Sequence, residues 1–397
     1  MTAGDDAVSD MGRRLRQLRL ARKKSLEVIG GLAGISASHL SRLESGQRAL
    51  DRRSLIKSLA DALEVAPSEI TGSAMPGDLP EDRWLDGVRV ALLAISVGEP
   101  QGQILPVEAL TQRVEDVLKA QRDCQYAAVG ERLPGLIRDL HSTMDTGRDK
   151  GELLKLLALT HVQGTQAWLM DVGASLDLGW QAAALAKQAA EQLDNDQLSL
   201  AVTAFGTSFG LMGAGAFDLA ERTLSAPNPG TDTSEAMQVS GMLALTSSLL
   251  AAAKGDQAER AAALEHAADL AQHTGEGNAL WFGFGPSNVG VWKMSVALEA
   301  GEHAEAAKIA TTVNPAALPS PTRRAAYWRE YGRALARLPR RQDEAVMMLR
   351  RAEQISPARI QRHPFMRSVL AELLVKAKRD AVGRELRGMA YRAGLPV

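Results

Sequence analysis

Residues 25–46 hold two short helix patterns separated by a glycine, and this pairing constrains the fold more than any other part of the chain. Ser25 and Ser36 each stand where a hydroxyl can accept a hydrogen bond from a free backbone N–H at the start of a helix. Gly34 breaks the first helix, and Gly46 ends the second. The sequence therefore predicts a helix-turn-helix, in which a tight turn joins two short helices.

The outer face of the second helix is small and polar at its start. Leu40 and Leu43 take inward positions three residues apart, which leaves Ala37, Ser38 and Arg42 on the outside. Small side chains let a helix approach base edges in the major groove of DNA, and an arginine there can donate two hydrogen bonds to guanine. We therefore expect a surface that reads DNA. The alternative is a helical hairpin used only for packing or dimerisation.

Residues 11–60 are strongly basic, although the whole chain is nearly neutral. They hold twelve Lys and Arg against three acidic residues, and because the net charge of the chain is −1, the remainder carries ten negative charges. This asymmetry is expected when one module binds a polyanion and the other does not. We expect residues 13–24, together with Arg48, Arg52 and Arg53, to flank the groove and contact phosphates. The alternative is a solvated basic face without a partner.

A family resemblance covers residues 8–72 and rests on the stretch MGRRLRQLRLARKKSLEVIGGLAGISASHLSRLESGQR, followed by SLIKSLADALEVAPSEI. This stretch resembles the five-helix DNA-binding domain of the lambda-repressor-like, xenobiotic-response-element (XRE) regulators. The resemblance places the recognition helix at residues 36–46. It also implies a partly buried ion pair between Arg19 and Glu44 that fixes the angle between two helices. It implies base contacts from Ala37, Ser38 and Arg42, and phosphate contacts from Ser36, His39 and Ser41.

The rest of the chain is expected to form a second domain. The segment SAMPGDLPED at residues 73–82 carries two prolines and three acids, a composition typical of a linker. After it, β-branched and aromatic residues are too sparse for a sheet, while Ala and Leu recur at helical spacing. We therefore predict an all-α fold: a DNA-binding domain at residues 8–72, a linker at 73–82 and a helical repeat domain at 83–397.

Short turn phrases recur along this second domain at a spacing close to forty residues. In the last unit, Ala345, Leu349, Ala352 and Pro357 have the offsets found in the second helix of a tetratricopeptide (TPR) repeat. Each helix pair of such an array buries its apolar stripe against the next pair. We therefore expect an α-solenoid of TPR-like helix pairs with a concave inner surface. The phrases are GAGAFDLAERTL at 213–224, KGDQAERAAAL at 254–264, AGEHAEAAKIA at 300–310 and RRQDEAVMML at 340–349.

Taken together, the two domains resemble the actinobacterial XRE-family transcriptional regulators with a C-terminal TPR-like domain. The phrase WFGFGPSNVGVWKMSVALEAGE at residues 281–302 is similar to a phrase of this group. The resemblance implies a regulator that binds a pseudo-palindromic operator in double-stranded DNA as a homodimer. Its array would dimerise and sense a peptide or small-molecule effector. The alternative is a TPR-type adaptor that captures a partner protein, with a helix-turn-helix domain that does not read DNA.

Aromatic residues make up 4% of the chain, yet four of them cluster within twelve residues around a helix break at Gly-Phe-Gly-Pro. Aromatic walls and an asparagine amide can hold a polar ligand. Two interpretations stay open: the rings fill gaps beside small residues, or they contact an effector. Arg323 and Arg324 follow a PSP turn and can bind a carboxylate, although such pairs are more often solvated. The candidate effector-binding residues are Trp281, Phe282, Phe284, Asn288 and Trp292.

The sequence argues against several other classes. It holds no P-loop, no G-x-S-x-G elbow and no H-E-x-x-H motif, and we therefore expect no enzyme. The single cysteine, Cys124, excludes an internal disulfide and has no ligand-spaced histidines beside it, so no metal or cofactor is expected. The chain opens MTAGDDAVSD, and charge or glycine interrupts each apolar run, from which we expect no membrane contact and a cytoplasmic location. We expect the isolated Trp168, Trp180 and Trp328 to pack in the core.

Overall fold

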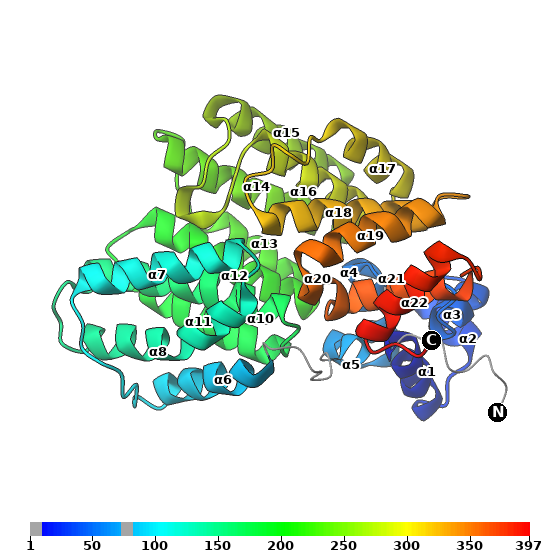
Figure 1. The fold of residues 1–397 in the computed structure, drawn as a ribbon, viewed down its shortest axis with the longest axis horizontal. Helices are drawn as coiled ribbons and strands as arrows, with labels where there is room; N and C mark the ends of the chain where they lie inside the picture. The colour runs from blue at the N-terminus through cyan, green and yellow to red at the C-terminus, as the bar shows by residue number, and fades with distance from the viewer. Residues whose placement is uncertain (1–9, 73–81) are drawn as a thin grey trace.

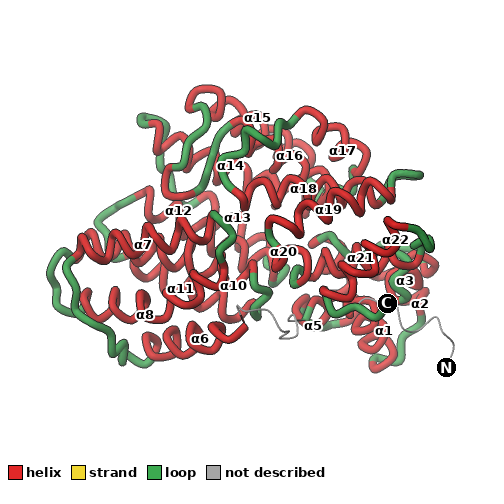
Figure 2. The backbone as a smooth tube through the Cα atoms, in the orientation of Figure 1, coloured by secondary structure: helices red, strands yellow, loops and turns green. Residues whose placement is uncertain are grey.

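The computed structural model describes residues 10–72 and 82–397, and within them every regular element is a helix (Figure 2). The predicted all-α class is confirmed. Of the predicted linker at residues 73–82, only Asp82 falls within the described residues, and α6 begins there.

Residues 10–72 fold into five helices whose limits follow the predicted caps. Ser25 Oγ accepts a hydrogen bond from the N–H of Val28 over 3.2 Å, and Ser36 Oγ accepts one from the N–H of His39 over 3.1 Å. Between these helices Gly34 takes a left-handed φ of 70°, a conformation that glycine adopts without strain. The helices are α1 (Asp10–Ala21), α2 (Leu26–Leu32), α3 (Ala37–Glu44), α4 (Arg53–Leu63) and α5 (Pro67–Thr71).

The remaining helices form an array in which most helices pack against the next one along the chain, while α6 packs against α8. The array begins with α6 (Asp82–Ser96), α7 (Val107–Arg122), α8 (Tyr126–Met144), α9 (Lys150–Leu159), α10 (Ala167–Asp171), α11 (Leu176–Glu191), α12 (Gln197–Gly213) and α13 (Phe217–Ser225). It continues with α14 (Ser234–Lys254), α15 (Gln257–Thr274), α16 (Pro286–Glu299), α17 (His303–Thr312), α18 (Pro321–Ala336) and α19 (Gln342–Ile355). It ends with α20 (Pro357–Gln361), α21 (Pro364–Val375) and α22 (Ala381–Arg392).

The recurring turn phrases mark the same structural position in successive helix pairs. In each phrase, a residue with a left-handed φ stands two positions before the second helix of the pair. Glycine takes this conformation without a steric cost, which explains its recurrence there. The predicted stack of helix pairs is therefore present, while its likeness to TPR repeats stays a prediction. The four turn residues are Gly215, Gly255, Gly301 and Arg340.

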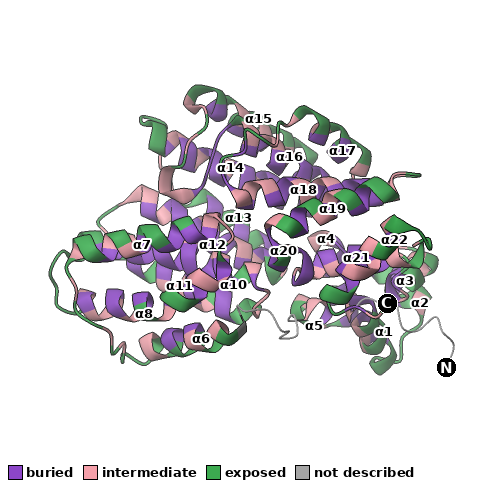
Figure 3. Ribbon diagram, in the orientation of Figure 1, coloured by how far each residue is buried: buried purple, intermediate pink, exposed green. Residues whose placement is uncertain are grey.

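The array curves back on itself (Figure 1). Helices α6–α13 form one lobe, α14–α19 form a second, and α20–α22 return to lie beside the N-terminal domain. Distant segments hold this return in place, because Arg359 of α20 donates to the Asp171 carboxylate over 2.9 Å and the hydroxyls of Tyr126 and Ser356 lie 3.1 Å apart. Buried residues line the inner faces of the helices, and exposed residues follow the outside (Figure 3).

Large apolar elements of the array are mostly interior. Helix α14 is long and apolar enough to cross a membrane by length and composition, but 78% of its most apolar window is buried inside the array. Trp168 is fully buried, and its indole N–H donates to the carbonyl of Tyr126 over 2.9 Å. The core prediction for Trp180 is wrong, since this ring is 42% exposed. It lies on the surface against Gly210 of α12, which leaves space for the ring but does not cover it.

Between α9 and α10 the helix widens into a π-helix over Thr160–Gln166. π-Helical segments are rare in proteins, and those that occur are often found at functional sites. Within it, His161 is fully buried and faces His141 of α8, with 3.0 Å between the two Nε2 atoms, so that one ring donates and the other accepts. Burial lowers the pKa of His141 to about 4. Burial and the neighbouring His141 hold the pKa of His161 well below 6.5.

Because burial lowers the pKa of both histidines, we predict that the stability of the fold depends on pH. Below the unfolded-state pKa of about 6.5, the unfolded chain binds protons that the folded pair does not, so stability falls with falling pH. For a histidine with the pKa of His141, the free energy of unfolding should drop by about 2 kcal/mol between pH 7.5 and pH 5. Urea denaturation at both pH values measures this drop.

The double variant His141→Gln, His161→Gln should show a shallower dependence of stability on pH. The matched control is His273→Gln, at an exposed position of α15, which should keep the dependence of the parent chain. Identical pH dependence in the double variant and the parent would show that the pair does not titrate as described.

Candidate DNA-binding interface and central cavity

Helix α3 presents the predicted base-reading residues to solvent. Ser38 and Arg42 are exposed and Ala37 is half-buried, whereas Leu40 and Leu43 are buried beneath them. The Arg42 guanidinium lies along its own helix, with Nε 3.3 Å from the carbonyl oxygen of Ser38. The array therefore does not cover the face of α3 that the sequence assigns to DNA.

An ion pair sets the position of α3. Arg19 Nε donates to Glu44 Oε1 over 2.6 Å, and Arg19 Nη2 donates to Glu44 Oε2 over 2.8 Å. The two side chains are 10% and 6% exposed. A two-pronged pair of this kind fixes orientation as well as distance. It joins the end of α1 to the end of α3, as the family resemblance implied.

The surroundings of α3 are positively charged. Of the residues predicted to contact phosphates at α3, Ser36 and Ser41 are exposed and His39 is half-buried. Burial lowers the pKa of His39, and the positive charges of Arg48 and other nearby arginines lower it further. A positive potential at this position favours the approach of DNA phosphates.

The connection between α3 and α4 is docked on the array through buried charges. Asp51, which is 4% exposed, accepts a hydrogen bond from Arg337 Nη2 over 2.9 Å, and its backbone carbonyl accepts one from Arg333 Nη2 over 2.8 Å. Arg337 Nη1 also lies 3.1 Å from Glu372 Oε2 of α21. Although burial raises the pKa of Asp51, the two arginines hold it below the ordinary value. We call the contact of residues 48–54 with α16, α18 and α21 the seam.

The array also supplies partners for the backbone of the seam. The N–H of Ala49 donates to Glu372 Oε2 over 2.8 Å. Helix α4 has no side-chain cap of its own, and Glu299 of α16 accepts from the N–H of Ser54 over 2.9 Å. A carboxylate is stabilised at a helix N-terminus because the first N–H groups have no partner inside the helix. The start of α4 therefore depends on a residue of the array.

The predicted phosphate-contacting arginines of this connection face the array. Arg53 Nη1 lies 3.4 Å from Glu299 Oε2, and Arg48 Nη1 lies 3.7 Å from Glu372 Oε1. Arg52 lies against the turn at Gly301, where an added Cβ would come within 2.9 Å of its Nη1 atom. The structure therefore places the three arginines in the seam.

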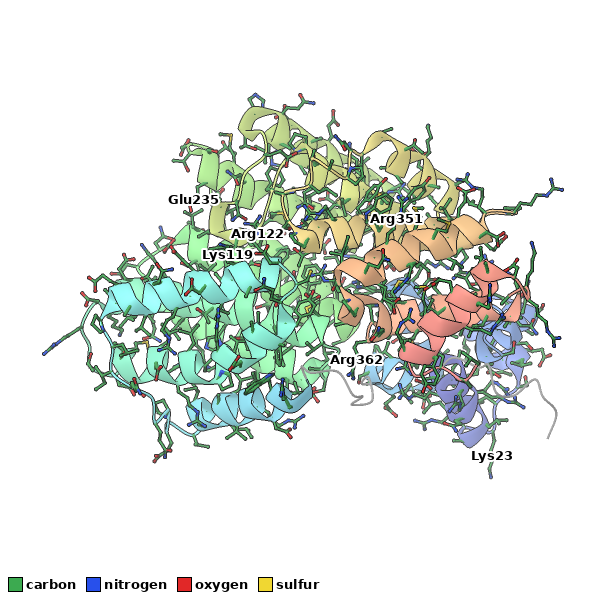
Figure 4. The ribbon with its side chains drawn as sticks, in the orientation of Figure 1. Lys23, Lys119, Arg122, Glu235, Arg351 and Arg362 are labelled. Carbon is green, nitrogen blue, oxygen red and sulfur yellow. The ribbon has the colours of Figure 1, made fainter. Side chains whose placement is uncertain are left out.

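A cavity of about 170 Å³ lies where the lobes of the array meet. Its walls come from α7, the π-helix, α10, α12, the segment 281–283, α18 and α20. The guanidinium groups of Arg122, Arg323 and Arg359 and the carboxylate of Asp171 line its polar part. Figure 4 places Arg122 at the boundary between the lobes.

The predicted effector-binding residues divide between the cavity and the core. Trp281 and Phe282 line the cavity. Phe284, Asn288 and Trp292 do not line it and are buried among the helices, with Phe284 and Asn288 fully enclosed. The helix break thus divides the cluster. Trp281 and Phe282 are placed where they can contact an effector, whereas Phe284, Asn288 and Trp292 fill space between the helices.

Backbone strain lies at the edge of the cavity. Leu280 and Trp281 have left-handed φ angles of 46° and 64°. Bulky residues rarely adopt this conformation, and such strain is found preferentially at functional sites. Arg323 Nη2 donates to the carbonyl of Phe282 over 2.7 Å and so helps to hold the segment.

Sequence reasoning missed most of the cavity. No motif marks Arg122, Gln163 or Arg359. Among the charged residues of the lining only Arg323 carried a signal, the PSP turn before it, and the aromatic cluster marked Trp281 and Phe282. No group of three His, Cys, Asp or Glu side chains that could hold a metal ion occurs in residues 10–72 and 82–397.

The seam generates a prediction. Arg337→Ala would leave Asp51 and Glu372 buried without this partner, and breaking a buried ion pair in this way costs about 3–5 kcal/mol. The N–H groups of residues 49–54 should then exchange with deuterium much faster. Hydrogen-exchange mass spectrometry measures the change.

The matched control is Arg341→Ala, which removes an exposed pair with Glu344 one turn further along the chain. It should leave the exchange at residues 49–54 unchanged, because solvent screens an exposed ion pair and this pair does not contact the seam. Unchanged exchange in Arg337→Ala would mean that the buried charges do not hold the seam.

Comparison with known proteins matches the N-terminal domain. Residues 10–71 match the family described as "Helix-turn-helix domain". The chain is similar to the HTH-type transcriptional repressor RghR of Bacillus subtilis (strain 168), with 36% identity over 58 residues that make up 15% of this chain and 43% of that protein. It is also similar to the uncharacterized HTH-type transcriptional regulator RghRB of the same organism, with 34% identity over 67 residues, 17% of this chain and 48% of that protein.

No solved structure matches the chain. The chain spans less than half the length of these two relatives. Residues 10–71 form a helix-turn-helix domain.

Proposed function

We propose that this chain is a DNA-binding transcription regulator in which α3 enters the major groove. The observation that carries the proposal is the uncovered outer face of α3, held in place by the Arg19–Glu44 pair. Ala37 and Ser38 allow the backbone to approach base edges, and Arg42 supplies a two-pronged donor for guanine. The two similar proteins from Bacillus subtilis, named as a transcriptional repressor and a transcriptional regulator, support the assignment.

The phosphate contacts of this proposal fall into two groups. The side chains of Ser36, which caps α3, and of His39 and Ser41, which lie in α3, need no rearrangement to meet the DNA backbone. The arginines of the seam do need one, because carboxylates of the array are the partners of Arg48 and Arg53, and Arg52 lies against the turn at Gly301. We propose that Arg48, Arg52 and Arg53 contact phosphates when the seam opens.

We further propose that the array senses a peptide or small-molecule effector in its central cavity and that α18 transmits the occupancy. Thr322 and Arg323, in the first turn of α18, line the cavity. Arg333 near its end and Arg337 just beyond it bind Asp51 in the seam. A helix of 16 residues spans about 24 Å as one rigid unit. An effector that favours one position of α18 would therefore shift the orientation of the DNA-binding domain.

The proposal includes a homodimer formed through the TPR-like array. Two copies of α3 about 34 Å apart would match a pseudo-palindromic operator, since that distance is one turn of DNA. As a regulator that meets DNA, the protein is proposed to act in the cytoplasm, without membrane contact, cofactor or catalytic step.

A protein-interaction adaptor is the second candidate. The docking of residues 48–54 on the array favours it, because a helix-turn-helix domain used only for packing would bury its basic residues in this way. The exposed Ser38 and Arg42 favour the regulator, because packing within the chain leaves their face unused.

The exchange Arg42→Ala tests the regulator. It should weaken binding to the operator by about 1–3 kcal/mol and relax the choice of base at one position. A gel-shift titration of the full chain on DNA from the region upstream of its own gene, at two salt concentrations, measures both affinity and salt slope. The matched control is Arg222→Ala on the exposed face of α13, which should bind as the parent does.

Sequence-selective binding that weakens steeply with salt is the expected result, because phosphate contacts release counterions. Weak binding without sequence preference would favour the adaptor. Unaltered affinity and footprint in Arg42→Ala would remove this residue from base reading.

A further inference from the structure

The central cavity holds more positive charge than its own carboxylate balances. Asp171 already accepts from Arg359 Nη2 and from Gln121 Nε2, each over 2.9 Å. Arg122 and Arg323 form no ion pair with any carboxylate within residues 10–72 and 82–397. Burial and the charges of Arg359 and Arg122 lower the pKa of Arg323 to about 10, so it stays charged at neutral pH. Three arginines and one aspartate therefore line the cavity, and Asp123 beside Arg122 and Asp171 near Arg323 offset part of this positive charge without pairing with either arginine.

Arg122 and Arg323 contact two residues that are adjacent in the chain. The Arg122 guanidinium lies over the ring of Trp281, 5.7 Å from its centroid, and Arg323 donates to the carbonyl of Phe282. A guanidinium has five N–H donors, and these contacts leave most of them free on each arginine. Paired guanidinium groups with free donors form the recognition element for a carboxylate.

Aromatic rings form the wall beside the charges. The rings of Phe205 and Phe282 meet edge to face with 4.9 Å between centroids, and Phe209 lies 5.0 Å from Phe205. All three residues line the cavity. An apolar cavity of about 150 Å³ is large enough for benzene. The volume of about 170 Å³ here thus suits one ring with a carboxylate, and it is too small for an extended peptide.

Buried polar atoms around the cavity lack partners in the described part of the chain. Gln163 Nε2 and Gln121 Oε1 are both buried without a hydrogen bond, and both residues line the cavity. Buried polar groups are nearly always hydrogen-bonded, so Gln163 can donate to a ligand that enters beside the two arginines, whereas Gln121 Oε1 can only accept. The π-helix that carries Gln163 and the strained Trp281 lie at the same place.

We propose that this cavity binds a small aromatic carboxylate, with Arg122 and Arg323 holding the carboxylate group and Trp281 and Phe282 enclosing the ring. The inference rests on the effector-sensing part of the proposed function and names the chemical class of the effector. Gln163 donates to the ligand from the side of the π-helix.

Calorimetric titration of the full chain with phenylacetate, without DNA, tests the ligand class. Phenylacetate should bind at least tenfold more tightly than 2-phenylethanol, which has the ring without the charge. It should also bind at least tenfold more tightly than acetate and inorganic phosphate, which have the charge without the ring. Equal binding of the alcohol, equal binding of phosphate, or no binding of phenylacetate would each overturn the proposal.

Two variants and their controls test the residues. Arg122→Gln and Arg323→Gln should each weaken phenylacetate binding at least tenfold. Arg351→Gln is the control for Arg122, because its guanidinium also lies over a tryptophan ring, that of Trp328, but outside the cavity (Figure 4). Arg324→Gln, next to Arg323 and outside the lining, is the second control. Both controls should bind as the parent does.

The circular dichroism spectrum and thermal midpoint of each variant establish that it is folded, and Arg122→Gln removes no hydrogen bond within the described structure. Equal losses in variants and controls would overturn the assignment of residues. A chain that binds operator DNA but no phenylacetate refutes this inference alone, whereas one that binds phenylacetate but no DNA refutes the regulator alone.

Discussion

Asp51, Arg333, Arg337 and Glu372 are charged groups buried between the DNA-binding domain and the array, and the arrangement of both depends on them. Each would cost several kcal/mol to bury alone, and the charges are tolerated because guanidinium and carboxylate groups meet at hydrogen-bonding distance. Apolar faces can slide over one another, whereas a guanidinium demands partners in fixed directions. The seam therefore specifies one orientation of the DNA-binding domain. Because the connection between α3 and α4 is the part that docks, this orientation also determines where the outer face of α3 points.

The two domains share core as well as charge. Phe365 of α21 packs with the apolar core of the N-terminal domain, and the guanidinium groups of Arg53 and Arg333 each lie 5.6 Å from its ring centroid. Asp10 at the start of α1 pairs with Arg367 of α21. Helix α21, near the end of the chain, thus contributes to the core of the N-terminal domain and pairs with its first helix. Because α18 and α21 both contact the DNA-binding domain directly, a displacement of either helix would change contacts of that domain.

Local features of the fold were predictable, whereas contacts between distant segments were not. Ser25, Ser36 and Gly34 act within a few residues, and the turn glycines of the array repeat one local conformation. The seam was invisible because Arg53 and its partner Glu299 are 246 residues apart, so that Arg53 read as a free basic residue. The same reason hid most of the cavity. The aromatic cluster indicated its position through Trp281 and Phe282, but nothing near Arg122 or Gln163 in the sequence marks them as their neighbours.

The charges at the two ends of α18 are balanced in different ways. At the seam, Arg333 pairs with Glu330 over 2.5 Å, and Arg337 pairs with Asp51 and Glu372. At the cavity, Arg323 has a carbonyl oxygen as its partner, and the nearest carboxylate is already occupied by Arg359. The arginines at the DNA-binding end of α18 are thus paired with carboxylates, whereas Arg323 at the cavity end is not. Repulsion between Arg122, Arg323 and Arg359 favours any displacement that separates them, and an anion among them removes that preference. Under the proposed function, the position of α18 would therefore depend on charge in the cavity, and the seam at its other end would respond to that position.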